Sequence, residues 1–432
     1  MKKFIYYILV ASVLFTGCKK DTVTEKAKEE VNPDSPDTPD TPDVQPVNVD
    51  PLASARKQCF FEDVENGTIT FVFDSTLWKA KNAKKVEVRG SFNDWKTTDG
   101  YSLTKCDTAK VLPYWYLTVP YSMIKCPGNC GQPEYKFVVD GSWKNAPSWL
   151  PAGYKFSGND VNQIIVFSTD DIEEIKAKSA QAAKKKSLSD FDLTTEAGKQ
   201  DISNVRVVPG TSKLIRCYHP FKYTDKNRNN TEFKRVELVK EYFESYGIKS
   251  DICLSENEEK NLETKTFSGE THKESISPYY KEIIDNGAVL YVGVKTGLGT
   301  PKYETCYSDP KGAKTCGWIG EIIDFIASDE TSAPYGIHCR LGTDRTGFFC
   351  AIIAALCGAN ADEIMADYQR SNNMGIMEYR DSKKMKYTLE MMLDVDDLSQ
   401  VSDLGAAIKN LLISGNYTTD GKVQKMLNKL KQ

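Results

Sequence analysis

Apolar residues follow two different patterns along the chain, and the change of pattern marks two folded parts. Between residues 59 and 167, apolar and polar residues alternate in short runs that Asn-Gly, Asp-Gly and Pro-Gly dipeptides separate. Alternation with a period of two predicts half-buried β-strands, and these dipeptides favour tight turns between antiparallel strands. The predicted strands cover residues 68–73, 86–90, 114–119, 135–139 and 164–167. We therefore expect an antiparallel, immunoglobulin-like β-sandwich at residues 58–168.

The second part, residues 201–432, alternates apolar runs with amphipathic segments. This pattern is typical of an α/β domain, in which helices flank a central sheet. The expected strands are 205–208, 214–217, 248–254 and 288–294, and the expected helices lie near 234–246 and 319–327. A chain of 432 residues is long enough for two such cores. Residues 169–200 between them are rich in Lys, Ala, Glu and Asp and are interpreted as a linker.

One segment of the second part combines a short strand, a polar loop and a buried helix. The strand is 335–337, the loop runs from 338 to 347, and residues 348–356 are almost wholly apolar. Asn360 with Glu363 predicts a capping box at the start of the following helix. This order places the loop at the N-terminal end of a buried helix.

The loop contains Cys339 and, six residues later, Arg345. Successive loop amides can converge on an anion, and the positive end of the helix dipole points to the same place. The same field lowers the pKa of a thiol, so Cys339 is predicted to be a thiolate nucleophile. The planar Arg345 guanidinium is suited to bind two phosphoryl oxygens. The loop is therefore a predicted phosphate site, with the expected binding residues Arg340, Leu341, Gly342, Thr343, Asp344 and Arg345.

Two neighbours of the nucleophile have supporting roles in this interpretation. Thr346 is expected to donate a hydrogen bond to the sulfur as it leaves, and His338 to order the loop from behind. The chain has three histidines, and Cys126 and Cys130 form a single pair of close cysteines, so no metal site is predicted. No cofactor is expected either.

The loop sequence has a clear family resemblance. From His338 to Gly347 it reads His-Cys-Arg-Leu-Gly-Thr-Asp-Arg-Thr-Gly. It resembles the cysteine-dependent tyrosine and dual-specificity phosphatases, in particular a bacterial branch whose loop reads His-Cys-x-x-Gly-Lys-Asp-Arg-Thr-Gly. Three further segments are similar to that branch: Leu214-Ile215-Arg216, Gly247-Ile248-Lys249 and Asp367-Tyr368-Gln369-Arg370-Ser371-Asn372. The resemblance implies a metal-independent phosphate-monoester hydrolase that forms a phosphocysteine at Cys339.

Two departures from that branch concern the site. Thr343 replaces the loop Lys that is linked to lipid or inositol phosphates in some members, which argues against a phosphoinositide. Cys253-Leu254-Ser255 stands where the branch has Asp-Leu-Arg after its second strand, so one contact near the site is lost or supplied elsewhere. Phosphotyrosine, a phosphoglucan and an inositol phosphate remain open as substrates.

A general acid must protonate the leaving oxygen, and the sequence offers two candidates. Asp309 lies thirty residues before Cys339, ahead of a helix, where the dual-specificity pattern places its acid. Asp344 lies inside the phosphate loop, and we prefer it because the bacterial branch is expected to use that position. Cys306 and Cys316 bracket Asp309, and a disulfide between them would pin its loop in an oxidising compartment.

The first domain resembles a second family, the glycogen-binding, early-set carbohydrate modules. Three segments carry the resemblance: 90–95 (Gly-Ser-Phe-Asn-Asp-Trp), 135–143 (Tyr-Lys-Phe-Val-Val-Asp-Gly-Ser-Trp) and 162–165 (Asn-Gln-Ile-Ile). It implies a glucan on the flat faces of Trp95 and Trp143, with hydrogen bonds from Lys136 and Asn162. The alternative is a spacer domain in which Trp95 only closes the edge of the sandwich.

Residues 1–18 predict export and lipid anchoring. Two Lys residues precede the apolar run 4–15, which is too short for a permanent membrane span but suits a secretory signal. The run ends in Leu-Phe-Thr-Gly-Cys, which resembles a bacterial lipobox and implies an acylated Cys18. Residues 19–57 are rich in Asp, Pro and Thr and are expected to form a disordered tether. The expected location is a bacterial cell envelope, periplasmic or on the cell surface.

Charge narrows the possible partners. The net charge is −4, and Lys and Arg are interspersed with Asp and Glu, so a nucleic-acid binder is excluded. Two functions remain. The protein is either a phosphatase that its first domain directs to a carbohydrate, or a surface lipoprotein that binds phosphate or carbohydrate without turnover.

Overall fold

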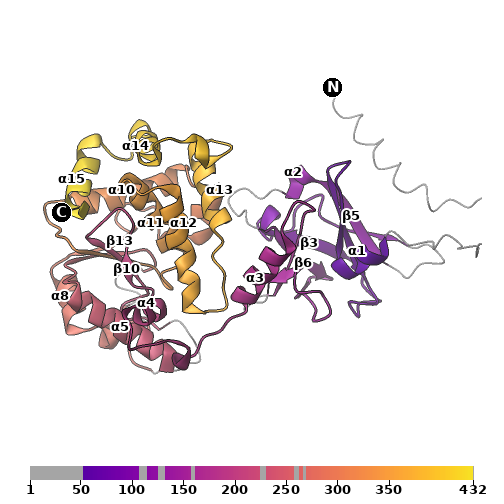
Figure 1. Cartoon of the computed structure of the whole chain (residues 1–432), viewed down its shortest axis with the longest axis horizontal. Coiled ribbons are helices and arrows are strands. Elements are labelled where there is room, and N and C mark those ends of the chain that lie inside the picture. Colours follow the sequence, from indigo (N-terminus) through magenta and orange to yellow (C-terminus); the bar gives the residue numbers. More distant parts are fainter. Residues whose placement is uncertain are drawn as a thin grey trace, which may run out of the picture.

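The protein folds into two bodies that a linker with its own helix joins (Figure 1). The computed structural model describes residues 52–106, 114–124, 132–156, 161–223, 230–256, 262–265 and 269–431. The predicted signal sequence with Cys18, most of the tether, and the pair Cys126 and Cys130 lie outside the described residues. Within the described part, no helix combines the length and the apolar character that a membrane crossing needs.

The N-terminal body, residues 59–167, contains two antiparallel sheets and is called the two-sheet domain below. One sheet has the order β1-β2-β5-β4; the other has the order β3-β6-β9-β8, with β7 paired to β6. The strands are β1 Phe60–Asp63, β2 Thr68–Asp74, β3 Val86–Gly90, β4 Thr104–Cys106, β5 Tyr114–Pro120, β6 Glu134–Val139, β7 Ser142–Lys144, β8 Lys155–Phe156 and β9 Asn162–Ile164. The short helices beside them are α1 Leu52–Gln58, η3 Ser91–Asn93 and α2 Tyr121–Ile124.

Aromatic side chains fill the space between the two sheets. Phe71 and Phe73 of β2 meet Tyr135 and Phe137 of β6, and the ring centroids are 5.1 Å apart in each pair. The structure thus has the antiparallel strands that alternation predicts; their assignment to the immunoglobulin-like sandwich class stays a prediction. The predicted strand 164–167 is wrong in its bounds, because the pairing of β9 with β6 ends at Ile164.

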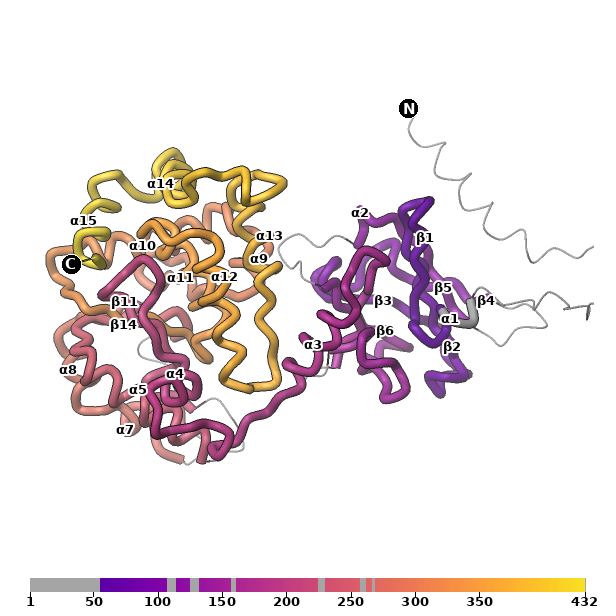
Figure 2. Tube along the Cα trace, viewed as in Figure 1, coloured from indigo at the N-terminus to yellow at the C-terminus, as the bar shows by residue number. Residues whose placement is uncertain are grey.

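The linker carries helix α3, Ile172–Ala182, followed by η4 Leu188–Asp190 and α4 Glu196–Ser203. Asp171 caps α3 by accepting hydrogen bonds from two backbone amides of its first turn. The helix packs on β8, where the Ser179 hydroxyl donates to the Lys155 carbonyl at 2.5 Å. Figure 2 follows the chain from α3 into the second body.

The second body is an α/β domain on a five-stranded sheet of order β10-β11-β14-β12-β13. The strands are β10 Arg206–Val207, β11 Leu214–Cys217, β12 Ser250–Cys253, β13 Val289–Tyr291 and β14 Tyr335–His338. The central strand, β14, runs parallel to both of its neighbours, β11 and β12. Each predicted strand region contains a strand, although β12 and β13 are shorter than the apolar runs around them.

Helices cover both faces of this sheet. Successive residues of β11 show it, because Leu214 packs into one hydrophobic cluster and Ile215 into another. The helices are α5 Asn230–Ser245, α7 His272–Ser275, α8 Pro278–Asp285, α9 Tyr303–Ser308, α10 Ala313–Ala327, α11 Asp344–Leu356, α12 Ala361–Arg370, η5 Ser371–Met374, α13 Ser382–Leu393, η6 Leu398–Gln400, α14 Leu404–Ser414 and α15 Asp420–Lys431.

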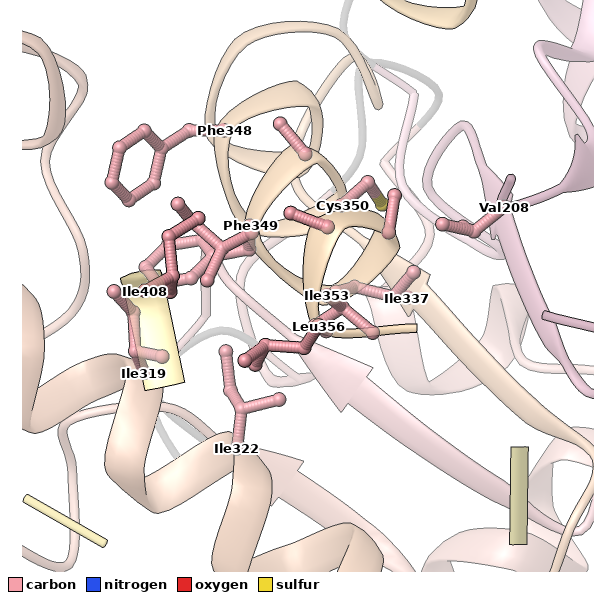
Figure 3. Close-up of a cluster of buried hydrophobic side chains, with 14 of the residues drawn as sticks. Val208, Ile319, Ile322, Ile337, Phe348, Phe349, Cys350, Ile353, Leu356 and Ile408 are labelled. Atoms are coloured by element: carbon pink, nitrogen blue, oxygen red, sulfur yellow. The ribbon is translucent and has the colours of Figure 1, made fainter. Parts of the chain in front are cut away.

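Helix α11 lies in the interior, as its apolar sequence predicts. Figure 3 shows Phe348, Phe349 and Ile353 of α11 among side chains of α10, α14 and β14. The predicted capping box of α12 is also present: Asn360 accepts from the Glu363 amide at 3.0 Å, and Glu363 accepts from the Asn360 amide at 2.9 Å. A buried helix with fixed ends holds the loop before it in one place.

Candidate active site

The site is the loop between the last residue of β14, His338, and the first residue of α11, Asp344. It follows the carboxyl end of a central parallel strand, where α/β sheets commonly bind ligands. The sulfur-bearing residue, Cys339, is only 3% exposed. Backbone amides at the start of α11 have no partner within the helix, so they are available to an anion.

Gly342 shapes the loop. Its φ is +72°, and a Cβ at this position would lie 2.1 Å from the Cys217 carbonyl oxygen of β11. The Gly342 carbonyl accepts hydrogen bonds from Asn204 Nδ2 and from Arg216 Nη2, each at 2.8 Å. Because C=O and N–H point in opposite directions in a trans peptide, this outward carbonyl directs the Thr343 amide into the loop. Residues far away in sequence thus fix the shape of the loop, and its binding of an anion stays a prediction.

A buried ion-pair network holds these donors. Asp367 of α12 pairs with Arg216, and its other oxygen accepts from Arg206 Nε at 2.5 Å. Burial alone would raise the pKa of Asp367, but the two guanidinium groups outweigh it and lower that pKa. Removing one partner of such a network leaves a buried charge unpaired and costs about 3–5 kcal/mol. Arg216 and Asp367 belong to two of the segments that resemble the phosphatase family, and in the structure both support the loop.

The loop gives Cys339 an acidity that other buried thiols lack. Burial would raise the pKa of Cys339, but the Arg345 guanidinium and the Thr346 hydroxyl and amide outweigh it, so the pKa lies below its ordinary value. Burial raises the pKa of Cys306 and of Cys350 to about 12. Among these thiols, the one in the loop is the one prepared to react as a thiolate.

Backbone carbonyls orient Arg345. Its Nη1 donates to the Leu254 carbonyl at 3.0 Å and to the Pro301 carbonyl at 3.3 Å. Leu254 belongs to the Cys253-Leu254-Ser255 segment that departs from the family pattern. Since this contact uses a backbone atom, the departure leaves it in place.

His338 lies behind the loop and is fully buried. Its Nδ1 is 3.1 Å from the Cys339 carbonyl oxygen and its Nε2 is 2.9 Å from Asp251 Oδ2. Both partners are hydrogen-bond acceptors, so this arrangement favours a ring with hydrogen on both nitrogens. Burial lowers the pKa of His338, but the Asp251 carboxylate outweighs it and raises that pKa. His338 thus links the first loop residue to β12, and its ordering role stays a prediction.

His219, Cys253 and His338 bring three potential metal-ligand atoms within 4.8 Å of one another. Both nitrogens of His338 are engaged, and His219 Nδ1 accepts from the backbone amides of residues 221 and 222. Burial lowers the pKa of His219 to about 3, so it is neutral. These hydrogen bonds leave two ligand atoms, fewer than the four of a structural zinc site.

The two general-acid candidates lie in different surroundings. Asp344 is partly buried, and its Oδ2 accepts from Arg380 Nη2 at 2.8 Å and from the Thr343 hydroxyl at 3.1 Å. Asp309 is exposed at the C-terminal end of α9. The predicted disulfide beside it is wrong, because Cys306 and Cys316 are free, buried thiols.

Arg380 is a site residue that sequence reasoning missed. It lies between η5 and α13, and one nitrogen contacts Asp344, the Thr343 hydroxyl and Glu378. Nothing near Arg380 in the sequence marks it, since it reaches the loop only through the packing of α13. It links the position of Asp344 to a segment outside the loop.

The remaining predicted loop residues differ in exposure. Arg340 is exposed, Leu341 is partly buried against a hydrophobic cluster, and Thr343 is buried. Thr346, in the first turn of α11, is completely buried beside the sulfur. Its predicted hydrogen bond to the leaving sulfur stays a prediction.

Comparison with known families agrees with this geometry. A family model described as tyrosine phosphatase family matches residues 152–412, more than half of the chain. The chain belongs to the tyrosine phosphatase family. A comparison with curated proteins gave no match. The α/β body, residues 201–431, is therefore called the phosphatase domain below, and phosphate esters are its class of substrate. The match begins before α3, so it includes the linker and the last strands of the two-sheet domain.

The four predicted sugar-binding residues line one cavity of about 830 Å³, which the phosphatase domain also borders. The rings of Trp95 and Trp143 are 6.2 Å apart and inclined by 48°. The Lys136 ammonium donates to Asn145 Oδ1 at 2.7 Å, and Asn162 Nδ2 donates to Glu134 at 2.6 Å. The two aromatic faces and the polar groups thus line one cavity, and Asp344 of the phosphatase domain lines it too.

Proposed function

We propose that this phosphatase hydrolyses phosphate monoesters through a covalent phosphocysteine at Cys339. The observation that carries the proposal is a buried thiol directly after β14, in the loop that leads into α11, whose pKa the Arg345 guanidinium helps to lower. A thiolate, converging amides and a planar cation are together what an in-line attack on phosphorus requires. No metal takes part in this proposal.

In the first step, the Cys339 thiolate attacks phosphorus, and an S–P bond forms as the bond to the leaving oxygen breaks. Arg345 and the loop amides bind the equatorial oxygens, where negative charge develops. The Asp344 carboxyl group gives its proton to the leaving oxygen, which departs as an alcohol or phenol. The step leaves phosphocysteine and an Asp344 carboxylate.

In the second step, that carboxylate takes a proton from water, and the water oxygen attacks phosphorus. The S–P bond breaks, inorganic phosphate is released, and Cys339 returns to the thiolate. Thr346 donates a hydrogen bond to the departing sulfur, which favours this step. Asp344 is protonated again, so the cycle consumes one ester and one water.

Phosphate release from para-nitrophenyl phosphate tests the proposal. Wild type should hydrolyse it, and peptide mass spectrometry after rapid acid quenching should find one phosphoryl group on Cys339. Cys339→Ser should abolish the turnover, whereas Cys106→Ser, a partly buried thiol of β4, should retain it. Equal rates for wild type and Cys339→Ser would eliminate the enzyme mechanism. Absence of phosphate release from wild type would leave a phosphate- or carbohydrate-binding lipoprotein as the function.

We also propose that this enzyme acts at a bacterial cell envelope. The basis is the sequence alone: the short apolar run and the Gly-Cys junction at Cys18, followed by the Pro- and Asp-rich residues 19–57. Acyl chains on Cys18 would anchor the protein, since each buried methylene contributes about 0.8 kcal/mol. Loss of membrane association in Cys18→Ser would support the anchor, and unchanged fractionation would argue against it.

A further inference from the structure

Arg380 fixes one oxygen of the Asp344 carboxyl group. Its Nη2 donates to Asp344 Oδ2 at 2.8 Å, and the Thr343 hydroxyl donates to the same oxygen at 3.1 Å. The Tyr307 hydroxyl donates to the Asp344 backbone carbonyl at 3.1 Å. Among the described residues, none donates a hydrogen bond to Oδ1. These contacts fix the carboxyl group at one oxygen and leave the other available for proton transfer.

Arg380 is a buried cation whose hydrogen-bonding groups are not all satisfied. It is 7% exposed, and its Nε is buried with no hydrogen-bond partner in the described part of the chain. Burial would lower the pKa of Arg380, but the carboxylates of Asp344 and Glu378 outweigh it and raise that pKa, so the guanidinium stays charged. An unsatisfied buried donor lowers the stability of a fold. Stability alone therefore explains this arginine poorly, and such exceptions are expected at functional sites.

The side chain of Asn372 fixes the backbone of Arg380. The Arg380 amide donates to Asn372 Oδ1 at 2.6 Å, and Asn372 Nδ2 donates to the Arg380 carbonyl at 3.0 Å. Asn372 belongs to η5, which follows directly on α12. The position of Arg380 thus depends on residues 371–381, which connect α12 to α13 and are called the 371–381 segment below.

The linker pairs with the 371–381 segment through backbone hydrogen bonds. The Lys186 amide donates to the Gly375 carbonyl at 2.8 Å, and the Met377 amide donates to the Lys184 carbonyl at 3.0 Å. The pairing is antiparallel. Figure 2 shows the linker passing this segment on its way to α4. Two hydrogen bonds between backbone atoms leave the segment little freedom to shift along the linker.

Helix α3 of the linker adds side-chain contacts beside Arg380. Gln181 donates to the Asn372 carbonyl at 3.1 Å. Lys178 pairs with Asp381 at 3.1 Å, and both side chains are 11% exposed. Asn372 holds the Arg380 backbone, and Asp381 is the residue after Arg380. Since α3 also packs on β8 of the two-sheet domain, a chain of contacts leads from that domain to Asp344.

We infer that Arg380 is a positioning residue for the Asp344 acid and that the linker keeps it in place, so that proton transfer to the leaving oxygen depends on residues 178–186. This inference rests on the proposed phosphatase activity with Asp344 as its acid. Arg380 acts through Asp344 and forms no bond to phosphorus. The linker then contributes to the chemical step, in addition to connecting the two domains.

Arg380→Gln in the full chain tests the inference with two substrates that differ in their leaving group. Phenyl phosphate has a poor leaving group that needs the proton, whereas para-nitrophenyl phosphate releases a stabilised anion that needs it less. General acids contribute about 10²–10⁴-fold, and a misplaced acid loses part of that. Arg380→Gln should therefore lower kcat/KM for phenyl phosphate about tenfold more than for para-nitrophenyl phosphate. The ratio of the two values does not depend on the fraction of folded protein, so lost stability cannot imitate this result.

A double variant separates positioning from a purely structural role. If Arg380 acts through Asp344, adding Arg380→Gln to Asp344→Asn should lower kcat/KM for phenyl phosphate no further. Additive losses would overturn the inference. An equal loss on both substrates for Arg380→Gln alone would also overturn it.

The role of the linker is tested by Lys178→Ala combined with Gln181→Ala. This variant should lower kcat/KM for phenyl phosphate by about threefold to thirtyfold, the range for changes along a coupled network, and affect para-nitrophenyl phosphate less. Lys176→Ala is the matched control, because Lys176 lies on the same helix and pairs with Glu173 of that helix at 2.7 Å. It should leave kcat/KM for both substrates unchanged.

Identical kinetics for the linker variant and this control would overturn the dependence on the linker. All these outcomes retain release of phosphate from para-nitrophenyl phosphate by wild type. They therefore differ from a failure of the proposed phosphatase activity, in which wild type releases phosphate from neither substrate.

Discussion

An alanine at position 342 would test whether the shape of the phosphate loop produces the activity. Gly342 has φ +72°, a backbone conformation that costs a residue with a Cβ about 1–2 kcal/mol. The added Cβ would also lie 2.1 Å from the Cys217 carbonyl oxygen and 3.0 Å from the Tyr218 amide nitrogen. Both are backbone atoms, so no side-chain rotation relieves the clash.

The size of the effect follows from this geometry. The contact must lengthen to about 3.4 Å to become ordinary, so the loop must move by roughly an ångström or more. A displacement of about 1 Å at a reacting centre costs about a hundredfold in rate. Overpacking adds about 1–3 kcal/mol to the conformational cost. Gly342→Ala should therefore lower the free energy of unfolding by about 2–5 kcal/mol and kcat/KM by about a hundredfold.

Gly247→Ala is the control for this experiment. Gly247 has φ +61° in the same domain, but a Cβ there meets nothing within 4 Å. It has the conformational cost without the clash. Thermal unfolding should place the Tm of Gly342→Ala at least about 2 °C below that of Gly247→Ala, and only Gly342→Ala should lose activity on para-nitrophenyl phosphate. Equal kcat/KM for the two variants would refute the argument that loop geometry determines catalysis.

Two further predictions concern the catalytic groups. Asp344→Asn should lower kcat about a hundredfold or more, within the range for general acids. Asp309→Asn should change kcat little, since Asp309 is exposed at the end of α9. The opposite ranking in steady-state kinetics would assign the acid to Asp309. The pKa of Cys339 is lowered, so mass spectrometry should find it alkylated by iodoacetamide at pH values where Cys306 stays intact, with the reaction stopping as pH falls through that pKa. Arg345→Gln removes the counter-charge and leaves burial, so the alkylation profile should move to higher pH; an unchanged profile would contradict the assignment of Arg345 as the main cause.

Much of the fold was predictable because its signals are local. The alternation of apolar and polar residues in the first domain predicted antiparallel strands, and the apolar segment after Gly347 predicted the buried helix α11; the structure contains both. Strand bounds were less certain, as β9 shows, because the partner strand decides where pairing ends. The order β11-β14-β12 was not predictable, since hydrogen bonding between parallel strands leaves no local pattern.

The candidate site also contains residues that are close in sequence and residues that only packing brings together. Cys339, Arg345 and Thr346 lie within one short loop and helix start, so their spacing predicted a phosphate site, and the family resemblance added Asp344 as a candidate acid. Arg380 reaches Asp344 from another element and was missed. The proposed disulfide failed for a related reason: two cysteines that bracket an aspartate in sequence are separate, buried thiols once α9 and α10 pack.

The order of residues by itself predicted the phosphate loop, because a helix N-terminus that follows a strand and a turn offers free backbone amides to an anion. Tertiary structure decided everything that depends on residues distant in sequence: the support of Gly342 by Asn204 and Arg216, and the approach of Trp143 to the wall that holds Asp344. Side-chain contacts of a few ångströms carry these effects, and only the packing of complete domains brings such residues within that distance.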